Sequence, residues 1–367
     1  MAQKTTKRIV ATIKREDTGL LTEAAGYSFA EVLSLIQQAR QRAYQTVNTE
    51  LIDLYWRVGE HISRKIVSDG WGKGTIGALS AFIQRSQPGI RAFSPQNLWR
   101  MRRFYDTYAP TPKLSTLLRE LPWSANLHIL TMAKLPEERE FYLRMATRSR
   151  WSVREVARQI NASLFERSVL HPTKSSKALA ALHPQAADFF KDTYVLEFLG
   201  RPPDHSEADL HGALVRNLAR FLTELGRDFC FVGSEYPVQV GGRDFALDLL
   251  FFHRALNSLV AIELKVGEFQ PEHLGKLEFY LEALDRDVRK SHEGPSIGLL
   301  LCATKDAEVV EYALSRSVSP ALIADYQALL PDKALLRTKL HELYEQLAPG
   351  DRSPPLAARK PLRKKKH

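Results

Sequence analysis

The strongest constraint on how this chain can fold is a pair of apolar runs that carry charged residues among their apolar positions. The first run, 245–252, contains Asp248, and the second, 258–265, contains Glu263-Leu-Lys265. Both are short and rich in Val, Leu, Ile and Phe, which predicts β-strands joined by a short connection. Charges in such runs are costly to bury, so Asp248, Glu263 and Lys265 require a charged partner or a metal.

The spacing of these three residues predicts a common site. Lys265 lies two residues beyond Glu263, so both side chains project from the same face of a strand. If the two strands are neighbours, Asp248 and Glu263 can bind one metal ion. Mg²⁺ and Mn²⁺ prefer carboxylate oxygens, and an ion held this way activates water and neutralises a phosphate. Lys265 would orient that water or neutralise the phosphate, so the pattern predicts metal-dependent phosphodiester hydrolysis.

Charge is unevenly distributed along the 367 residues. Residues 1–170 hold 26 Lys and Arg against 15 Asp and Glu, residues 171–350 hold 19 against 26, and residues 351–367 hold 7 against 1. A basic part joined to an acidic one suits a protein that contacts a polyanion with one domain and binds a divalent metal with the other. Basic helices with an ordinary solvated surface would give the same counts.

The order of the patterns predicts an α+β chain of two domains. We expect an all-helical domain followed by an α/β domain with a mixed central sheet. A change to Ser, Thr, Lys, Pro and Ala without periodicity marks the boundary. The expected divisions are a basic flexible N-terminus at 1–27, a helical DNA-binding domain at 28–167, a linker at 168–184, the α/β domain at 185–347 and a disordered basic tail at 348–367.

Individual elements follow from the hydrophobic periodicity. In the first domain, three- and four-residue spacing predicts helices at 29–45 and 51–67. In the second, the predicted strands are 229–233, 236–240, 245–252, 259–265 and 297–303, and the predicted helices are 207–225, 271–284 and 308–315. The two cysteines, Cys230 and Cys302, have apolar neighbours, which predicts two buried thiols.

Three arginines on one predicted helix are candidate DNA contacts. Ser94-Pro95 is a helix start signal, and Arg100, Arg102 and Arg103 lie in the helix that follows. Arg100 and Arg103 fall outside the expected apolar stripe of Leu98, Met101 and Tyr105. A helix that follows a turn and exposes arginines suits a helix-turn-helix or winged-helix DNA reader, although an amphipathic bundle helix has the same pattern.

The acid and the Glu-x-Lys triplet, in their strand setting, resemble the PD-(D/E)XK nuclease superfamily. Segments 231–253 and 259–281, together with 93–105, 121–124 and 151–154, resemble the YhcG-type nuclease family more narrowly. The resemblance covers roughly residues 30–340. It implies a winged-helix-like first domain of unknown function and a restriction-endonuclease-like second domain. It also implies a bacterial or phage-borne protein that acts on DNA in repair, recombination, restriction or mobile-element defence.

The resemblance extends to the helix after the Glu-x-Lys strand. Lys276 and Tyr280 are spaced like the Gln-x-x-x-Tyr of some superfamily branches, with Lys in place of Gln. Residues at i and i+4 share a helix face, so both could contact the DNA backbone. A surface lysine beside a half-buried tyrosine is the alternative.

The third metal ligand is the least defined part of the pattern. Superfamily members often carry an acid on the helix before the core strands, where this chain has His211. Glu207 lies one turn earlier on the same face, and Glu235 lies on the first hairpin. Glu207, His211 and Glu235 are therefore the candidate additional ligands for Mg²⁺ or Mn²⁺.

Two other classes of function remain open. One is a catalytically inactive nuclease-fold protein that binds DNA or assembles complexes, and the other is an interaction scaffold in which the same charges form buried ion pairs. The sequence has neither an apolar membrane span nor the pattern of a signal peptide, so we expect a cytoplasmic, nucleoid-associated protein without a small-molecule cofactor. A homodimer is expected because cutting both strands needs two sites.

Overall fold

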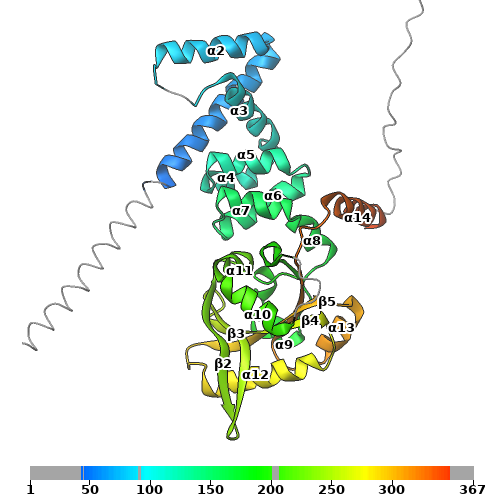
Figure 1. Cartoon of the computed structure of the whole chain (residues 1–367). Helices are drawn as coiled ribbons and strands as arrows, with labels where there is room; N and C mark the ends of the chain where they lie inside the picture. Colours follow the sequence, from blue (N-terminus) through cyan, green and yellow to red (C-terminus); the bar gives the residue numbers. More distant parts are fainter. Residues whose placement is uncertain (1–42, 44, 90–91, 201–205, 348–367) are drawn as a thin grey trace, which may run out of the picture. The chain divides into compact units, whose positions relative to one another are not determined.

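The computed structural model describes residues 43, 45–89, 92–200 and 206–347. The chain divides into two compact units, Met1–Arg148 and Ser149–His367, which we call unit 1 and unit 2 (Figure 1). The expected basic termini, 1–27 and 348–367, and most of the expected helix at 29–45 lie outside the described residues.

Unit 1 is helical throughout its described part. A helix over 45–69 is followed by α2 (Lys73–Ser86), α3 (Pro95–Tyr108), η1 (Pro112–Leu114), α4 (Ser115–Glu120), α5 (Trp123–Met132) and α6 (Pro136–Arg148). The all-helical expectation is therefore met here. The β-wing of a winged-helix fold is not among the elements described between residues 45 and 148.

Helix α3 begins as its sequence predicts. The Ser94 side chain accepts a hydrogen bond from Asn97 N, and Pro95 occupies the first turn. Phe104, rather than Tyr105, joins the buried stripe, because a helical repeat of 3.6 residues places it beside Met101 and Tyr108. The α3 stripe packs against the helix over 45–69 and α2, and the shared core contains Tyr55, Ile62, Ile76, Leu98 and Met101.

Unit 2 combines helices with one sheet. Its helical elements are α7 (Val153–Asn161), α8 (Leu164–Leu170), α9 (Lys177–Leu182), η2 (Ala186–Asp188), η3 (Glu197–Leu199), α10 (Glu207–Arg216), α11 (Leu218–Leu225), α12 (His273–Asp287), α13 (Ala307–Ser315) and α14 (Lys333–Leu347). Its strands are β1 (Thr193–Val195), β2 (Phe229–Val240), β3 (Arg243–His253), β4 (Ser258–Glu268), β5 (Gly294–Thr304) and β6 (Ala321–Gln327).

The six strands form one mixed sheet in the order β1-β6-β5-β4-β3-β2. Strands β2, β3 and β4 pair antiparallel, and β4, β5, β6 and β1 pair parallel. The expected strands at 229–233 and 236–240 are one strand, β2, whose register shifts between Phe231 and Gly233. The β2–β3 hairpin projects beyond the rest of unit 2 (Figure 1). Sequence periodicity did not predict β1, which has three residues, or β6, which contains Asp325.

Helices cover both faces of this sheet. Leu210 of α10 and Phe221 of α11 belong to the core on one face, whereas Leu277 and Leu281 of α12 belong to the core on the other. Gly298 of β5 lets α12 approach, because a Cβ atom there would lie 2.8 Å from a Leu277 methyl carbon. The sheet is therefore a buried middle layer between two layers of helices.

The helix predicted over 207–225 is broken at Asn217 into α10 and α11. The Asn217 side chain donates to Ala213 O at 3.0 Å. Asn217 N also donates to Ala213 O, at 3.1 Å, so α10 and α11 follow each other directly with Asn217 between them.

The expected linker at 168–184 is a folded part of unit 2. It contains the end of α8, residues 168–170, and all of α9, and Ser175 forms an antiparallel bridge with Leu322 of β6. Ser176 is buried, and its hydroxyl donates to Ser319 O at 2.7 Å. Helix α7 lies in the expected first domain, 28–167, and its contacts group it with unit 2, which begins at Ser149. The expected domain boundary at 168–184 stays a prediction.

The two cysteines differ in burial. Cys302 is buried in β5, and burial raises the pKa of its thiol to about 12. Cys230 is exposed, so the expectation of two buried thiols is wrong for this residue. It lies on β2, an edge strand of the sheet, where one side of the pairing is missing.

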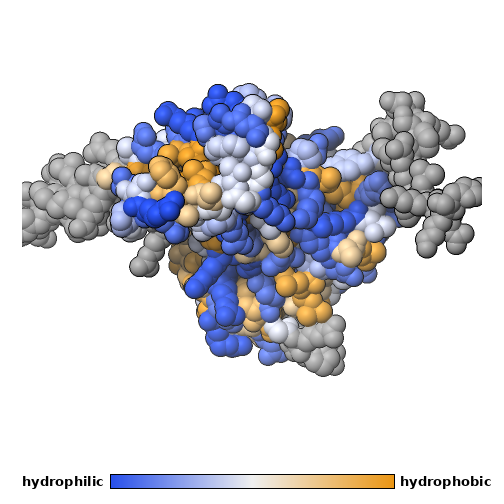
Figure 2. Space-filling view, turned by 90° about the horizontal axis from the view of Figure 1, so that it is seen from above, coloured by the Kyte–Doolittle hydropathy of each residue, from blue (hydrophilic) through white to orange (hydrophobic). Residues whose placement is uncertain are grey.

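No helix in the described part of the chain is long and apolar enough to cross a membrane. The face in Figure 2 is mainly hydrophilic and carries hydrophobic residues in separate patches. Scattered apolar residues of this kind are normal on a protein surface.

A buried ion cluster fastens α7 to the rest of unit 2. The Glu224 carboxylate, 1% exposed, accepts from Arg158 of α7, lies 2.9 Å from Lys191 Nζ and accepts from Val195 N at 3.1 Å. Burial opposes ionisation of Glu224, but Lys191 and Arg158 outweigh it and lower its pKa from 4.5 to about 2. A carboxylate paired in this way stabilises the fold only while it is ionised.

Glu224→Gln should lower the free energy of unfolding at neutral pH by about 3–5 kcal/mol, because it leaves buried cations without their anion. The folded pKa of Glu224 lies below its ordinary value of 4.5, so its stabilisation is present above that pH and is lost as pH falls toward 2. Urea denaturation across this window should show a steeper loss in the wild type than in the variant. Glu282→Gln, at an exposed pair with Arg286, is the matched control. Equal pH slopes for wild type and Glu224→Gln would contradict this role.

Candidate functional site

The register of β3 and β4 brings Asp248 beside Glu263. Leu249 pairs with Ile262, so Asp248 and Glu263 are the next residues along the two antiparallel strands. Leu264 N donates to Asp248 Oδ2 at 2.7 Å, which fixes this carboxylate against β4. The two acids thus converge at one point of the sheet from adjacent strands.

Glu263 is the most deeply buried charge of this cluster, with an exposed fraction of 0%. Its Oε1 accepts from Lys276 Nζ of α12 and lies 3.4 Å from Lys265 Nζ. Its Oε2 has no hydrogen-bond partner among the described residues. Burial, followed by the neighbouring charge of Asp248, raises the pKa of Glu263 against the opposing effect of the two lysines.

Helix α10 places two further residues at the site. Its capping box joins Ser206 and Asp209, which fixes the start of the helix. Glu207 accepts from Lys265 Nζ at 3.0 and 2.9 Å, and one ring nitrogen of His211 lies 3.1 Å from Asp248 O. The i, i+4 spacing of Glu207 and His211 therefore brings both to the site, where Glu207 binds the lysine and His211 contacts the strand backbone.

The residues present fit a hard divalent cation with few protein ligands. In the described ranges, no three His, Cys, Asp or Glu side chains form a group that could hold a metal ion. Asp248 and Glu263 are adjacent, however, and the buried Oε2 of Glu263 lacks a partner. Mg²⁺ usually takes one or two carboxylates and completes its shell with water and substrate phosphate, so two acids suffice.

Glu235 lies on the edge strand near Asp248. It falls between the pairs Ser234–Leu249 and Tyr236–Leu247, which places it opposite Asp248. Its side chain is exposed, and its φ of 47° is unusual for a residue other than glycine. It makes no hydrogen bond or ion pair to the described site residues, so its expected role as a ligand stays a prediction.

Lys276 and Tyr280 do share a face of α12 but differ in exposure. The Lys276 side chain is 47% exposed and reaches Glu263, and its Nζ lies 5.5 Å from the centre of the Tyr280 ring. Tyr280 is 2% exposed, and its hydroxyl donates to Ala246 O at 2.6 Å. A buried ring with its hydroxyl bound to the backbone favours the packing alternative for Tyr280 over direct DNA contact.

His273 belongs to this neighbourhood and was not among the residues predicted from sequence. Burial, followed by the charge of Lys265, lowers the pKa of its imidazole. Its Nδ1 accepts from Gln270 N at 3.1 Å, which fixes the ring at the start of α12. A histidine in the first turn of the helix after the Glu-x-Lys strand is the sequence signal that could have indicated it.

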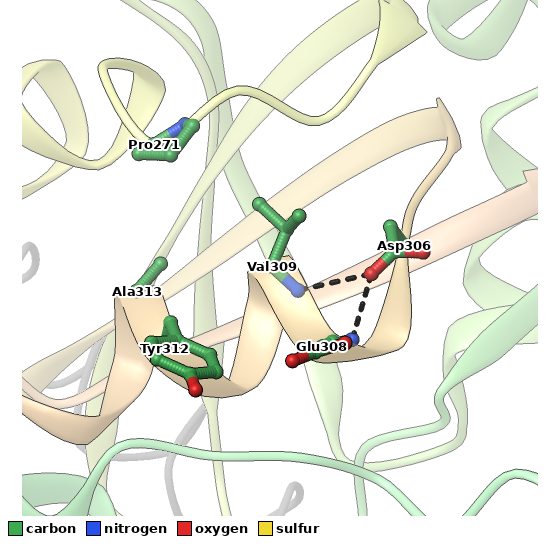
Figure 3. Close-up of a pocket in the computed structure, with 6 residues that line it drawn as sticks. All are labelled: Pro271, Asp306, Glu308, Val309, Tyr312 and Ala313. Atoms are coloured by element: carbon green, nitrogen blue, oxygen red, sulfur yellow. Dashed lines mark hydrogen bonds between the residues drawn. The ribbon is translucent and has the colours of Figure 1, made fainter.

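A separate open pocket of about 650 Å³ lies on α13 (Figure 3). It is lined by Pro271, Asp306, Glu308, Val309, Tyr312 and Ala313. Asp306 caps α13 by accepting from Glu308 N and Val309 N, and these bonds lower the pKa of the Asp306 carboxyl. None of the residues predicted from sequence lines this pocket, and its carboxylate at the helix start has a structural role.

The three candidate arginines of unit 1 lie on α3 with different surroundings. Arg100 and Arg103 are exposed, and Arg103 donates to Leu130 O at 3.4 Å. Arg102 is half-buried, pairs with Asp106 at 3.0 Å and lies 5.4 Å from the Trp99 ring centre. Arg100 forms no ion pair within the part of the chain that the structure describes. Of the three, Arg100 and Arg103 are the more available to a polyanion.

The sheet, its two helical layers and the Asp-Glu-x-Lys site define a nuclease domain of the PD-(D/E)XK class. The model of the YhcG PDDEXK nuclease domain matches residues 187–341, and that of the DUF1016 N-terminal domain matches residues 31–167. The curated protein "Putative nuclease YhcG" of Escherichia coli (strain K12) is 31% identical in an alignment of 359 positions that covers 88% of this chain and 95% of the relative. The chain therefore belongs to the YhcG nuclease family.

Two solved structures show partial similarity. A repair endonuclease from Pyrococcus abyssi matches 36% of this chain and 50% of its own, with 14% identity and a TM-score of 0.24. The apo form of EndoMS matches the same shares, with 17% identity and a TM-score of 0.23. This chain thus spans half the length of each of the two.

Tyr280→Phe should lower the free energy of unfolding by about 1 kcal/mol, because Ala246 O loses its hydrogen bond in a buried setting. DNA affinity should stay at the wild-type level if Tyr280 only packs. Urea denaturation and fluorescence anisotropy measure the two quantities. Tyr312→Phe, at a tyrosine that is 73% exposed, is the control for loss of a hydroxyl. Unchanged stability together with weaker DNA binding would restore the DNA-contact hypothesis.

Proposed function

We propose that this protein is a DNA endonuclease that uses Mg²⁺ or Mn²⁺ and binds DNA through its basic helical unit, unit 1. The observation that supports it most is the buried Glu263 carboxylate, which lies beside Asp248 and has one oxygen without a partner. Burying a carboxylate oxygen without a hydrogen-bond partner costs free energy. A divalent ion is a ligand that this oxygen and the neighbouring acid could bind together.

Each residue of the site has a distinct role in this proposal. Asp248 and Glu263 would hold the ion, which when bound supplies an activated water and neutralises charge on the phosphate. Lys265 is placed by Glu207 at the edge of the acids, where its ammonium can orient the water or stabilise the developing phosphate charge. His211 supports the backbone at Asp248 and so helps to fix the first ligand.

Asp248→Asn and Lys265→Met should each reduce metal-dependent DNA cleavage by about a hundredfold or more, because each removes a group that stabilises the transition state. Asparagine retains an oxygen that can accept from Leu264 N, so the strand pairing is preserved. Cleavage of plasmid DNA with Mg²⁺, and with EDTA in parallel, measures the effect. Asp244→Asn, an exposed residue of the same strand, is the matched control.

Full activity in both folded variants would refute the assignment of the site. Cleavage that survives EDTA in the wild type would refute the requirement for metal.

The basic character of unit 1 supports a role in holding DNA. Residues 1–148 hold 22 Lys and Arg against 13 Asp and Glu, and Arg100 and Arg103 are exposed on α3. Cationic side chains that contact phosphates release counterions, which makes affinity fall with salt. The homodimer expected for double-strand cleavage stays a prediction, which sedimentation of the full chain would check.

The double variant Arg100→Ala/Arg103→Ala should weaken DNA binding and flatten the plot of log affinity against log salt by about one to two units. Fluorescence anisotropy over a range of NaCl concentrations gives this slope. Arg85→Ala/Arg144→Ala removes two other exposed arginines of unit 1 and serves as the control. A slope equal to that of the wild type would assign Arg100 and Arg103 to the solvated surface.

A second candidate function is DNA binding without cleavage. It is favoured by the pairing of Lys265 with Glu207 and of Lys276 with Glu263, which satisfies much of the charge at the site. Incubation of plasmid, linear and branched DNA with Mg²⁺ separates the two functions. Binding to any of these substrates without cleavage of any would favour the inactive alternative.

A further inference from the structure

We propose that Lys276 is an internal counter-cation of Glu263 that competes with the divalent metal and thereby sets the metal affinity of the site. This inference rests on the proposed function, because it concerns the same two carboxylates. It assigns to this lysine a role that differs from a contact with DNA alone.

The two lysines near Glu263 are not equivalent. Lys265 donates to both oxygens of Glu207 and lies farther from Glu263, at 3.4 Å. Lys276 donates to Glu263 Oε1 at the shorter distance and has no other ion-pair partner within the described ranges. Lys276 therefore provides most of the charge that neutralises Glu263.

The burial of the partners shows why such a cation is needed. Glu263 is fully buried beside Asp248, and an ionised carboxylate in this setting is costly without a compensating charge. A bound divalent ion would supply that charge. When no metal is bound, the Lys276 ammonium supplies this positive charge. Metal and ammonium therefore have the same electrostatic function at Glu263.

The exposure of the two lysines shows which ammonium can move away from Glu263. The Lys265 side chain is only 14% exposed and is bound by Glu207, whereas the Lys276 side chain is 47% exposed. Lys276 reaches the acid from α12 on a long flexible chain, so its ammonium can turn to solvent without moving the backbone. A metal ion bound to Glu263 would repel the Lys276 ammonium, even if the ammonium stayed close to Oε1.

In the position that bonds Glu263, the Lys276 ammonium also lies near an aromatic ring. The Tyr280 ring, one turn along α12, lies 5.5 Å from Nζ and is fixed by the bond of its hydroxyl to Ala246 O. An aromatic face attracts an ammonium, so a displaced Lys276 would stay near the site. There it remains able to contact a substrate phosphate.

Binding of Mn²⁺ to the full-length protein tests this inference without measuring cleavage. Titration followed by electron paramagnetic resonance, at mildly alkaline pH, should show about tenfold tighter binding by Lys276→Gln than by the wild type, because the competing charge-assisted hydrogen bond is gone. Lys276→Arg keeps the charge and should bind Mn²⁺ no more tightly than the wild type. Lys290→Gln, an exposed lysine just beyond α12, is the control for loss of a surface charge.

Thermal unfolding provides a second readout if Lys276→Gln is less stable. Loss of the counter-cation should lower its melting temperature without metal, and Mn²⁺ should raise it by more than in the wild type. Equal or weaker Mn²⁺ binding by Lys276→Gln would overturn the role of Lys276 as a competitor.

Asp248→Asn separates this inference from the proposed function. If Asp248→Asn loses Mn²⁺ binding while Lys276→Gln binds like the wild type, the metal site stands and only the competition is refuted. If Asp248→Asn binds Mn²⁺ as well as the wild type does, the metal site at Asp248 and Glu263 is refuted, and the role of Lys276 with it.

Discussion

The burial of one carboxylate, Glu263, is the constraint on which the rest of the site depends. The central position of β4, between β3 and β5, removes this side chain from solvent. An ionised group there needs opposite charge close by, and two helices supply or support it. Helix α12 brings Lys276, and α10 holds Lys265 through Glu207, whereas β3 adds the like charge of Asp248. The elements of unit 2 around Glu263 thus set the electrostatic surroundings of this buried charge.

The same physical problem has a different solution on the other side of unit 2. Glu224 is as buried as Glu263, but both of its oxygens are satisfied by Lys191, Arg158 and Val195 N. The pKa of Glu224 is lowered, whereas that of Glu263 is raised. A fully paired acid stabilises the fold, and an incompletely paired acid is poised to take a ligand. This contrast within one domain is the physical reason for assigning structure to the first and chemistry to the second.

Much of the nuclease domain follows from local patterns. Alternation and β-branched composition predicted the strands that carry Asp248 and Glu263, and the two-residue spacing predicted that Glu263 and Lys265 share a face. Membership of the YhcG family confirms the resemblance seen in these segments. Local patterns failed where long-range pairing decides the structure. Strand β6 pairs with β1 from the opposite end of the domain, and residues 168–184 fold because Ser175 and Ser176 bond to residues near β6. Such contacts leave little trace in a short window of sequence.

The sequence alone determined which residues we propose for the chemistry, because charges inside apolar strands are costly to bury without a partner or a metal. Only the tertiary structure decided how those charges are shared. The i, i+4 spacing of Glu207 and His211 indicated a common face, but not that one would bind Lys265 and the other the backbone of Asp248. Likewise, the spacing of Lys276 and Tyr280 did not reveal that the lysine reaches Glu263 while the tyrosine is buried. Periodicity places a residue on a face, whereas the packing of that face against another element selects its partner.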